Sequence, residues 1–399
     1  MLVDHDTQLL ENVDWLIEMG PGAGESGGSI VSQGILEEIK NNPSSLISPF
    51  LSKKTFKPIR KQSINTEIFA EGYIQLDTLP IHTVKNLNLK IPKHKMISVT
   101  GVSGSGKTTL VLESLIPALQ AKFSNSKIPN HIKCIEANGI NRVNVIDATP
   151  IGINVRSTVA TYSGILDDLR KLYADTNEAK SCGYKNSDFS YNTGSLRCPN
   201  CDGTGQITMD VQFLPDVEID CPECNGSRYK KEIDNIKYLD LSLTECLSLT
   251  ISQALTRFAK IPKIYNRLKI LSDLGLGYLT LGEATPTLSG GEAQRLKLAS
   301  ELGKAQNDAL FVFDEPTIGL HPLDVQTLIN VFQMLIDQGA TVLIIEHDMD
   351  VIANSDYIID MGPGGGKSGG TVVAEGTPKD IADNPHSITG KYLKMLKNI

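Results

Sequence analysis

An octapeptide with the pattern G-x-x-x-x-G-K-[ST] constrains the fold of this chain more than any other feature. It reads GVSGSGKT over 101–108, after the β-branched run 95–100 and before 109–122, where leucines recur at helical spacing. Glycines at such a turn let backbone N–H groups surround a phosphate, and the N-terminus of the following helix adds positive potential. The order strand, phosphate loop, helix therefore predicts an α/β fold that binds a nucleotide.

The residues of this phosphate loop have separate expected roles. Lys107 would reach the β- and γ-phosphates, and the Thr108 hydroxyl would ligate Mg²⁺. The nucleotide-binding residues predicted here are Gly101, Ser103, Gly104, Ser105, Gly106, Lys107, Thr108 and Thr109.

Two continuous apolar runs, 309–313 and 341–345, predict strands that are buried on both faces of a parallel sheet. A helical pattern at 324–337 lies between them, and the order strand, helix, strand predicts a doubly wound α/β core. Asp314 and Glu315 follow the first strand directly. In that place Asp314 would hold Mg²⁺, and Glu315 would polarise the attacking water, a role worth about 10²–10⁴ in rate.

The sequence LSGGE at 288–292 precedes a second amphipathic helix pattern. Ser289, Gly290 and Gly291 would begin that helix, and its free N–H groups can bind a γ-phosphate. Ser289 and Glu292 also have the spacing of a capping box, so a structural role is compatible with the same residues. Together with the phosphate loop, this motif resembles the signature of the ABC ATPase family.

The ABC resemblance implies further roles. In that family the signature completes the phosphate site of an opposing module, and a switch histidine after the last strand contacts the γ-phosphate. His347 stands at that place. Glu315 and His347 are therefore the expected catalytic residues, with ATP and Mg²⁺ as cofactors.

Four of the seven cysteines form two Cys-x-x-Cys pairs that are separated by nineteen residues. This spacing predicts a tetrahedral zinc site made of Cys198, Cys201, Cys221 and Cys224. Gly203 and Gly226 would permit the tight turns after each pair. The other cysteines, Cys134, Cys182 and Cys246, have no partner spacing and are expected to be buried. An odd count with paired spacing indicates a reducing compartment, so we expect a cytoplasmic protein.

The chain also repeats itself at an offset of 342 residues. The pattern of 4–43, with Gly-Pro-Gly, Ser-Gly-Gly and Asn-Pro, returns in 346–385. So long a period excludes a solenoid. It indicates the tails of two tandem modules, of which the second is whole.

These features predict five segments. The tail of a first ABC module occupies 1–52, and a basic linker occupies 53–65. The ATP-binding core follows in two parts, 66–155 with the phosphate loop and 281–399 with the signature, the Asp-Glu strand end, the switch histidine and a tail. The signature and zinc region, 156–280, is inserted between them.

A zinc site between phosphate loop and signature is unusual among ABC modules and resembles the UvrA family, in its carboxy-terminal half. Other stretches that agree with this family are 146–147, 150–152, 160–164, 189–192, 213–216, 288–302 and 314–321. The resemblance implies an ABC-type phosphate-loop core, tandem modules, dimerisation with ATP, and DNA binding. In the repair proteins of the family it also implies a UvrB partner.

Several positions depart from the family pattern. Ala148 replaces a glutamine that couples the nucleotide to the inserted domain, and 187–188 is Ser-Asp where the family has Gly-Arg. Of the basic stretch before the zinc cysteines only Arg197 is left, and 156–245 holds ten basic and fifteen acidic residues. The departures indicate a paralogue of the repair protein, and some paralogues serve tolerance of DNA-binding drugs.

Two functions follow from this sequence. The first is an ATPase that acts on DNA in nucleotide excision repair or drug tolerance; the alternative is an ATP-gated interaction module without productive DNA recognition. Net charge is −8, so DNA binding needs a local basic surface, for which the candidates are Lys185, Arg197, Arg228, Lys230 and Lys231.

Other classes fit the sequence less well. The region around the cysteines lacks the heptads of an SMC or Rad50-like protein. The zinc insert and the long glycine-rich tail argue against a transporter ATPase subunit, and no run of 18 apolar residues predicts a membrane span. The first residues show no secretory signal. The expected partner besides DNA is a second copy or a first ABC module.

Overall fold

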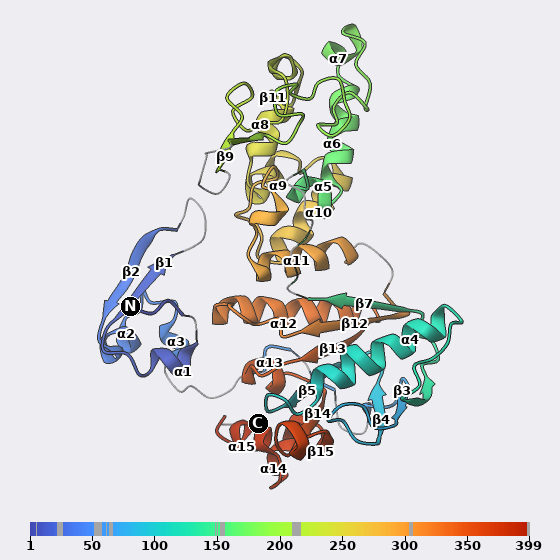
Figure 1. The fold of residues 1–399 in the computed structure, drawn as a ribbon. Coiled ribbons are helices and arrows are strands. Elements are labelled where there is room, and N and C mark those ends of the chain that lie inside the picture. The colour runs from blue at the N-terminus through green and yellow to red at the C-terminus, as the bar shows by residue number, and fades with distance from the viewer. Residues whose placement is uncertain are drawn as a thin grey trace. The chain divides into compact units, whose positions relative to one another are not determined.

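The computed structural model divides the chain into two compact units, Met1–Ala148 with Lys304–Ile399, and Thr149–Gly303. Figure 1 shows their elements. The residues that it describes are 1–4, 6–21, 27–51, 58–60, 62–63, 67–147, 149, 151, 156–209, 217–302 and 306–396. Ala148, Pro150, 213–216 and most of the predicted linker 53–65 lie outside them, as do His5 and 22–26 of the first repeat. The domain boundaries given above stay predictions.

A six-stranded sheet is the main sheet of the first unit, in the order β15-β14-β5-β13-β12-β7. β15 is antiparallel to β14, and all other neighbours are parallel. Its strands are β5 (Met96–Gly101), β7 (Arg142–Ile146), β12 (Ala309–Asp314), β13 (Thr341–Ile345), β14 (Tyr357–Gly362) and β15 (Thr371–Gly376). The two apolar runs predicted as buried strands are thus β12 and β13, the β-branched run predicted as a strand is β5, and the α/β fold class is confirmed.

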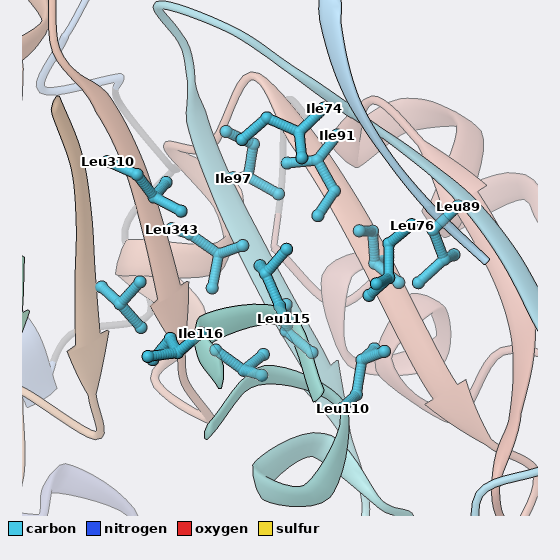
Figure 2. Packing of buried hydrophobic residues seen from close by; sticks show 14 of the residues in the cluster. Ile74, Leu76, Leu89, Ile91, Ile97, Leu110, Leu115, Ile116, Leu310 and Leu343 are labelled. Carbon is cyan, nitrogen blue, oxygen red and sulfur yellow. The ribbon is translucent and has the colours of Figure 1, made fainter. Parts of the chain in front are cut away.

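A smaller antiparallel sheet packs against the same core, in the order β4-β3-β6. Its strands are β3 (Tyr73–Thr78), β4 (Leu87–Pro92) and β6 (Ile132–Glu136). Ile74 of this sheet, Ile97 of β5 and Leu115 of the helix after the phosphate loop belong to one buried cluster (Figure 2). Because β5 and that helix share this cluster, the phosphate loop between them is held at both ends.

The helix predicted over 109–122 begins as a π-helix, Thr109–Leu115, and continues as α4, Ile116–Phe123. The Ile116 N–H bonds to Val111 O, five residues back, which widens the turn. Pro117, which has no N–H, follows at the start of α4. The remaining helices of this part are α12 (Pro322–Asp337), α13 (Met349–Ala353), α14 (Pro378–Asp383) and α15 (Ile388–Leu393).

The sequence repeat is also a repeat of local structure. The first tail contains α1 (Thr7–Leu10), β1 (Leu16–Gly20), β2 (Ser29–Gly34), α2 (Leu36–Asn41) and α3 (Ser48–Leu51). At the same offset the β1–β2 hairpin corresponds to β14–β15, with a register shift at Glu18/Met19 in one and Asp360/Met361 in the other. Gly34 and Gly376, which have φ of 154° and 148°, occupy matching positions.

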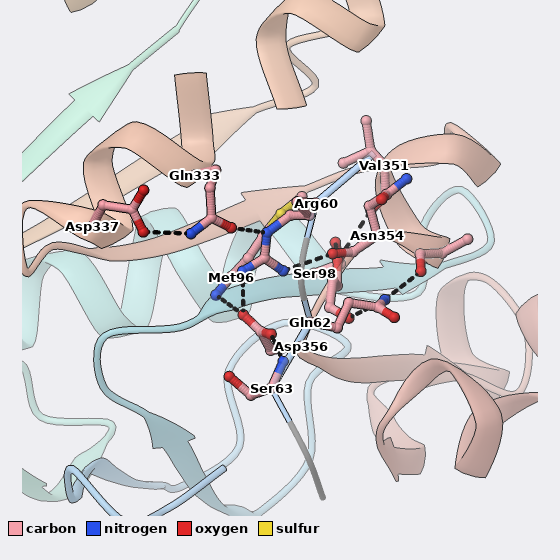
Figure 3. Close-up of polar contacts among 12 residues, drawn as sticks. Arg60, Gln62, Ser63, Met96, Ser98, Gln333, Asp337, Val351, Asn354 and Asp356 are labelled. Carbon is pink, nitrogen blue, oxygen red and sulfur yellow. Dashed lines mark hydrogen bonds and ion pairs between the residues drawn. The ribbon is translucent and has the colours of Figure 1, made fainter. Parts of the chain in front are cut away.

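Part of the predicted linker is bound to the first unit (Figure 3). The Arg60 guanidinium lies 2.9 Å from Asp356, and both side chains are at most 2% exposed. Ser63 N–H donates to the same carboxylate, and Gln62 donates to the carbonyls of Ala353 and Ser355. The composition of 53–65 predicts a linker, but Ile59, Arg60, Gln62 and Ser63 are bound to the end of α13 and the loop before β14 by hydrogen bonds that are buried or partly buried.

The second unit is mostly helical. Its helices are α5 (Val159–Tyr162), α6 (Ile165–Ala174), α7 (Asn177–Ser181), α8 (Leu243–Ser248), α9 (Ile251–Arg257), α10 (Pro262–Asp273) and α11 (Gly290–Glu301). Two hairpins complete it: β8 (Gln206–Met209) with β9 (Val217–Asp220), and β10 (Lys237–Tyr238) with β11 (Leu241–Ser242). Buried Tyr173, Phe189 and Tyr229 fill its core. Among the described residues, no helix is long and apolar enough to cross a membrane.

Candidate functional site

The phosphate loop joins β5 to the π-helical turn in the predicted order. Gly101, Gly104 and Gly106 have φ of 128°, 74° and 101°, a region that L side chains rarely adopt. Lys107 is 6% exposed, and its Nζ donates to the carbonyls of Gly101 (2.9 Å) and Val102 (3.2 Å). The ammonium group is therefore held against the loop itself, where a phosphate would replace these carbonyls as its partner.

Carboxylates gather beside this lysine at the carboxyl end of the sheet. Burial raises the pKa of Asp314, and the charges of Glu315, Asp147 and Glu346 raise it further, against the opposing charge of Lys107. Burial lowers the pKa of Lys107, although Glu315, Asp360 and Asp314 oppose this. Neighbouring carboxylates repel one another, and a divalent cation bound between them relieves this repulsion. Asp314 and Thr108 stay the predicted ligands of Mg²⁺.

Glu315 and His347, the two predicted catalytic residues, lie together. His347 Nε2 is 3.3 Å from Glu315 Oε1, and both side chains are partly exposed. Glu315 has φ of 46°, an unusual backbone conformation for this residue type, and its N–H donates to Ile345 O at 2.9 Å. A non-glycine residue held in that conformation by its neighbours is typical of functional positions. The pair can orient a water next to the phosphate loop.

Glu346 is a residue of this site that the motifs did not identify. It is 2% exposed, and its Oε1 accepts from Thr317 N–H at 3.0 Å and from the Thr317 hydroxyl at 2.5 Å. Its Oε2 accepts from the N–H of His347 (2.5 Å) and of Asp348 (3.1 Å). Glu346 thus connects the loop after β12 to the loop after β13. Its position beside His347 in the repeat was the only sequence signal for it.

The signature motif begins α11 in the second unit. Ser289 Oγ accepts from Glu292 N–H at 3.3 Å, and Ser289 N–H donates to Glu292 Oε2 at 2.7 Å. This capping box confirms the structural role of the motif. Because Ser289 Oγ only accepts in these bonds, its proton is available to a phosphate. The Tyr278 hydroxyl also donates to the Glu292 carboxylate.

The four paired cysteines come together in the second unit. Their sulfur atoms lie within 4.8 Å of one another, at 3.9 Å for Cys198–Cys221 and 3.7 Å for Cys201–Cys224. Tetrahedral zinc with bonds of about 2.3 Å places its sulfurs about 3.8 Å apart, so the arrangement fits zinc. The β8–β9 hairpin connects the two pairs.

The turns at the cysteines provide N–H donors to the sulfurs. Gly203 and Gly226 each have φ of 78°, as expected for tight turns. Burial raises the pKa of the Cys221 thiol, but hydrogen bonds from the N–H groups of Cys224 and Glu223 and from the side chains of Asn200 and Cys224 bring this pKa to about 6. Burial raises the pKa of the Cys198 and Cys224 thiols. A thiolate is the form that binds a metal. Of the other cysteines, Cys246 is buried as predicted, whereas Cys134 is half-buried and Cys182 is exposed, so that expectation was wrong for the latter two.

The predicted phosphate-contacting residues do not form one exposed group. Arg228 is 9% exposed and lies over the Tyr191 ring, 5.3 Å from its centroid, so its assignment to a DNA phosphate was wrong. Arg197 forms a 2.9 Å ion pair with Asp202. Lys185 and Lys231 are exposed, and Lys230 is half-buried. The packing of an aromatic core decided the place of Arg228, which spacing alone could not indicate.

Comparison with known proteins gives consistent matches over nearly the whole chain. UvrABC system protein A of Bacillus subtilis is 45% identical over 397 residues, which are 99% of this chain and 41% of that protein. The protein of the same name from Clostridium acetobutylicum is 44% identical over 401 residues, 99% of this chain and 42% of the relative. The chain thus spans about two fifths of the length of these curated relatives.

A solved structure gives the same result. The crystal structure of UvrA2 from Deinococcus radiodurans matches with a TM-score of 0.91 and 39% identity, covering 99% of this chain and 48% of that one. No model of a protein family matches the chain.

Proposed function

Because this chain belongs to the UvrA family of ABC ATPases, we propose that it binds and hydrolyses ATP and acts on DNA in excision repair or in tolerance of DNA-binding drugs. The observation that supports this most is the group of Lys107, Asp314, Glu315 and His347 at the carboxyl end of the main sheet. A UvrB-like subunit is the partner that the family resemblance implies.

Each residue of that group has a distinct part in the proposed reaction. Backbone N–H groups of the phosphate loop and Lys107 would bind the β- and γ-phosphates. Asp314 and Thr108 would hold Mg²⁺, which neutralises charge on the phosphate oxygens when it is bound. Glu315 would accept the proton of the attacking water. His347, 3.3 Å from Glu315, would orient that carboxylate and contact the γ-phosphate.

Substitution of Glu315 tests the ATPase. Glu315→Gln removes the base and should lower ATP turnover by about 10²–10⁴ while ATP still binds. Lys107→Ala should abolish binding. The exposed Glu136, at the end of β6, provides a matched control, since Glu136→Gln should change neither. Unchanged turnover in Glu315→Gln would exclude this carboxylate as the base.

The first tail is proposed to belong to a first ABC module. In β14, Tyr357, Ile359 and Met361 are buried, at most 6% exposed, where that strand pairs with β5. Their counterparts at the offset of 342 are Trp15, Ile17 and Met19, which are 53–59% exposed. The equivalent of β5 and its phosphate loop would cover this apolar face in a first module.

The cysteine cluster is proposed to hold one structural zinc ion. Four buried sulfurs at tetrahedral spacing are a closed, all-thiolate ligand set, which is typical of structural and not catalytic zinc. Zinc would then fix the turns around Gly203 and Gly226 and so stabilise this part of the second unit.

DNA binding is tested by its salt dependence. We expect affinity to fall steeply with salt, and Lys185→Ala or Lys231→Ala to weaken binding to all sequences and to lower the salt slope by about one each. Lys391→Ala, on α15 of the first unit, is the control that should leave the slope unchanged. Failure to bind DNA at low salt in the presence of ATP would favour the interaction-module hypothesis.

A further inference from the structure

We propose that the glycine-rich loop 362–370, between β14 and β15, supports the outer side of the phosphate loop, and that Gly365 is a positioning residue for the nucleotide. This loop was prominent in the sequence as half of the repeat, yet no role followed from it. The inference deepens the proposed ATP-binding function and rests on it.

Two hydrogen bonds join the loops. Gly366 N–H donates to Gly104 O, and Gly370 N–H donates to Ser105 O, each at 3.0 Å. Phosphate loops aim N–H groups at the ligand, so carbonyls such as these point away and need donors elsewhere. The glycine-rich loop supplies those donors from its own backbone.

These bonds fix the direction of N–H groups inside the phosphate loop. A trans peptide is planar, and its C=O and N–H point in opposite directions. Holding Ser105 O from outside therefore sets the direction of Gly106 N–H. Holding Gly104 O likewise sets that of Ser105 N–H, which donates to Val102 O at 3.1 Å and closes the turn.

Close approach explains why Gly365 is a glycine. Its φ and ψ, −92° and 162°, are extended and suit alanine equally well. A Cβ at this position would lie 2.6 Å from Ser103 O, a backbone atom of the phosphate loop. The residue therefore lacks a side chain because the phosphate loop occupies the space, and not because the backbone conformation demands it.

The phosphate loop also has a glycine where it lies close to the chain that leads into the glycine-rich loop. A Cβ on Gly101 would lie 2.1 Å from Met361 O, the residue before the glycine-rich loop. Next to Met361, the buried Asp360 accepts from the hydroxyls of Thr100 (2.8 Å) and Ser387 (2.6 Å). The base of the glycine-rich loop is thereby tied to β5, so the loop is a fixed support.

A pair of glycine substitutions tests the inference. Gly365→Ala pushes against Ser103 O, and we expect the Kd for Mg-ATP to rise about tenfold or more, because the N–H groups shift. Gly364→Ala is the matched control. The nearest atom to its Cβ is Ser368 Oγ at 2.7 Å, the end of a side chain that can rotate away with loss of only its exposed hydrogen bond to Gly365 O. We expect its Kd to stay within about twofold of wild type.

Titration calorimetry with Mg-ATP and melting without nucleotide separate positioning from folding. We expect Gly365→Ala to lose affinity while its melting temperature without nucleotide stays close to that of Gly364→Ala. Lys367→Ala, which removes the exposed cation of the loop, should bind ATP normally. The inference would be overturned if Gly365→Ala bound Mg-ATP as tightly as the wild type. It would also be overturned if Gly365→Ala and Gly364→Ala lost Mg-ATP affinity equally.

Hydrogen exchange of the wild-type protein gives a result that does not depend on any variant. Amides of 362–370 should exchange more slowly when Mg-ATP binds, whereas those of β8–β9 should not change. Absence of added protection in 362–370 would overturn the inference while leaving ATP binding intact. If the wild type does not bind ATP at all, the proposed function fails, and the inference fails with it.

Discussion

Single carboxylates next to His347 determine how the loops of the nucleotide site are held. Glu346 accepts hydrogen bonds from both the loop after β12 and the loop after β13. Asp348 caps α13, with Oδ1 accepting from the N–H groups of Asp350 (2.9 Å) and Val351 (3.0 Å). Burial raises the pKa of Asp348 to about 7, and the charges of Asp350 and Glu346 add to the effect.

The raised pKa of Asp348 predicts a pH-dependent stability. The folded state favours the protonated form of Asp348. The contribution of this group to the free energy of unfolding is therefore present in full below about pH 4 and is lost as pH rises through about 7. Asp348→Asn keeps the capping oxygen but cannot ionise. We expect it to unfold at higher urea concentration than wild type at pH 8, by on the order of 1–2 kcal/mol, with little difference at pH 4.

Urea titrations at both pH values check this expectation. The exposed Asp383, at the end of α14, gives a control, since Asp383→Asn should follow the wild type at both. If Asp348→Asn increased the free energy of unfolding equally at pH 4 and pH 8, the expected titration of Asp348 would be contradicted.

At the scale of elements, polar bonds hold segments whose sequence predicts little structure. The stretch around Arg60 is one such segment, tied to the loop before β14 by the buried pair with Asp356 (Figure 3). Met96 N–H donates to the same carboxylate at 2.8 Å, so the start of β5 shares this anchor.

Loss of Arg60 should destabilise the first unit. Arg60→Ala leaves the buried Asp356 without its cation, and we expect about 3 kcal/mol of lost stability in urea unfolding. The Arg142–Asp308 pair, with side chains 34% and 39% exposed, is the matched control. Arg142→Ala should lose less than about 1 kcal/mol. Similar losses in the two variants would mean that burial of the Arg60 pair has no special effect.

The turns around the four cysteines, in contrast, are elements that the sequence did predict. Cys201→Ser removes one of four sulfurs, and we expect metal analysis to show loss of about one zinc per chain, with faster proteolysis around β8–β9. Cys182→Ser, at an exposed cysteine outside the cluster, should retain the metal. Full retention of zinc in Cys201→Ser would rule out the four-cysteine site.

At the scale of the whole molecule, the nucleotide residues and the signature belong to different compact units. The ABC resemblance implies that a phosphate loop is completed by the signature of another module. We propose that this second module is a second copy of the chain or a first ABC module; in a pair of copies, Ser289 of one would serve the nucleotide of the other. A two-fold arrangement would complete both sites at once.

Pairing predicts that ATP turnover depends on protein concentration. Specific activity should rise with enzyme concentration, and Glu315→Gln should be trapped by ATP as a dimer in size-exclusion chromatography. Ser289→Ala should lower turnover while leaving ATP binding to the monomer unchanged. Constant specific activity from a protein that stays monomeric would refute the shared site.

The sequence by itself determined the features whose chemistry is local. The phosphate loop, the Asp-Glu strand end, the capped signature helix and the cysteine pairs depend on residues that are close in sequence, so spacing was enough to predict them. Continuous apolar runs were also enough to predict β12 and β13, because both strands are buried on both faces. The β-branched residues of 95–100 were enough to predict β5.

Only the tertiary structure decided which distant residues meet. Glu346 joins Thr317, Arg60 joins Asp356, and the glycine-rich loop joins the phosphate loop, over separations in sequence from 29 to 296 residues. The burial of Arg228 depended in the same way on Tyr191. Such contacts arise from the packing of strands and helices in space. The residues of one segment therefore do not predict which distant segment will contact it.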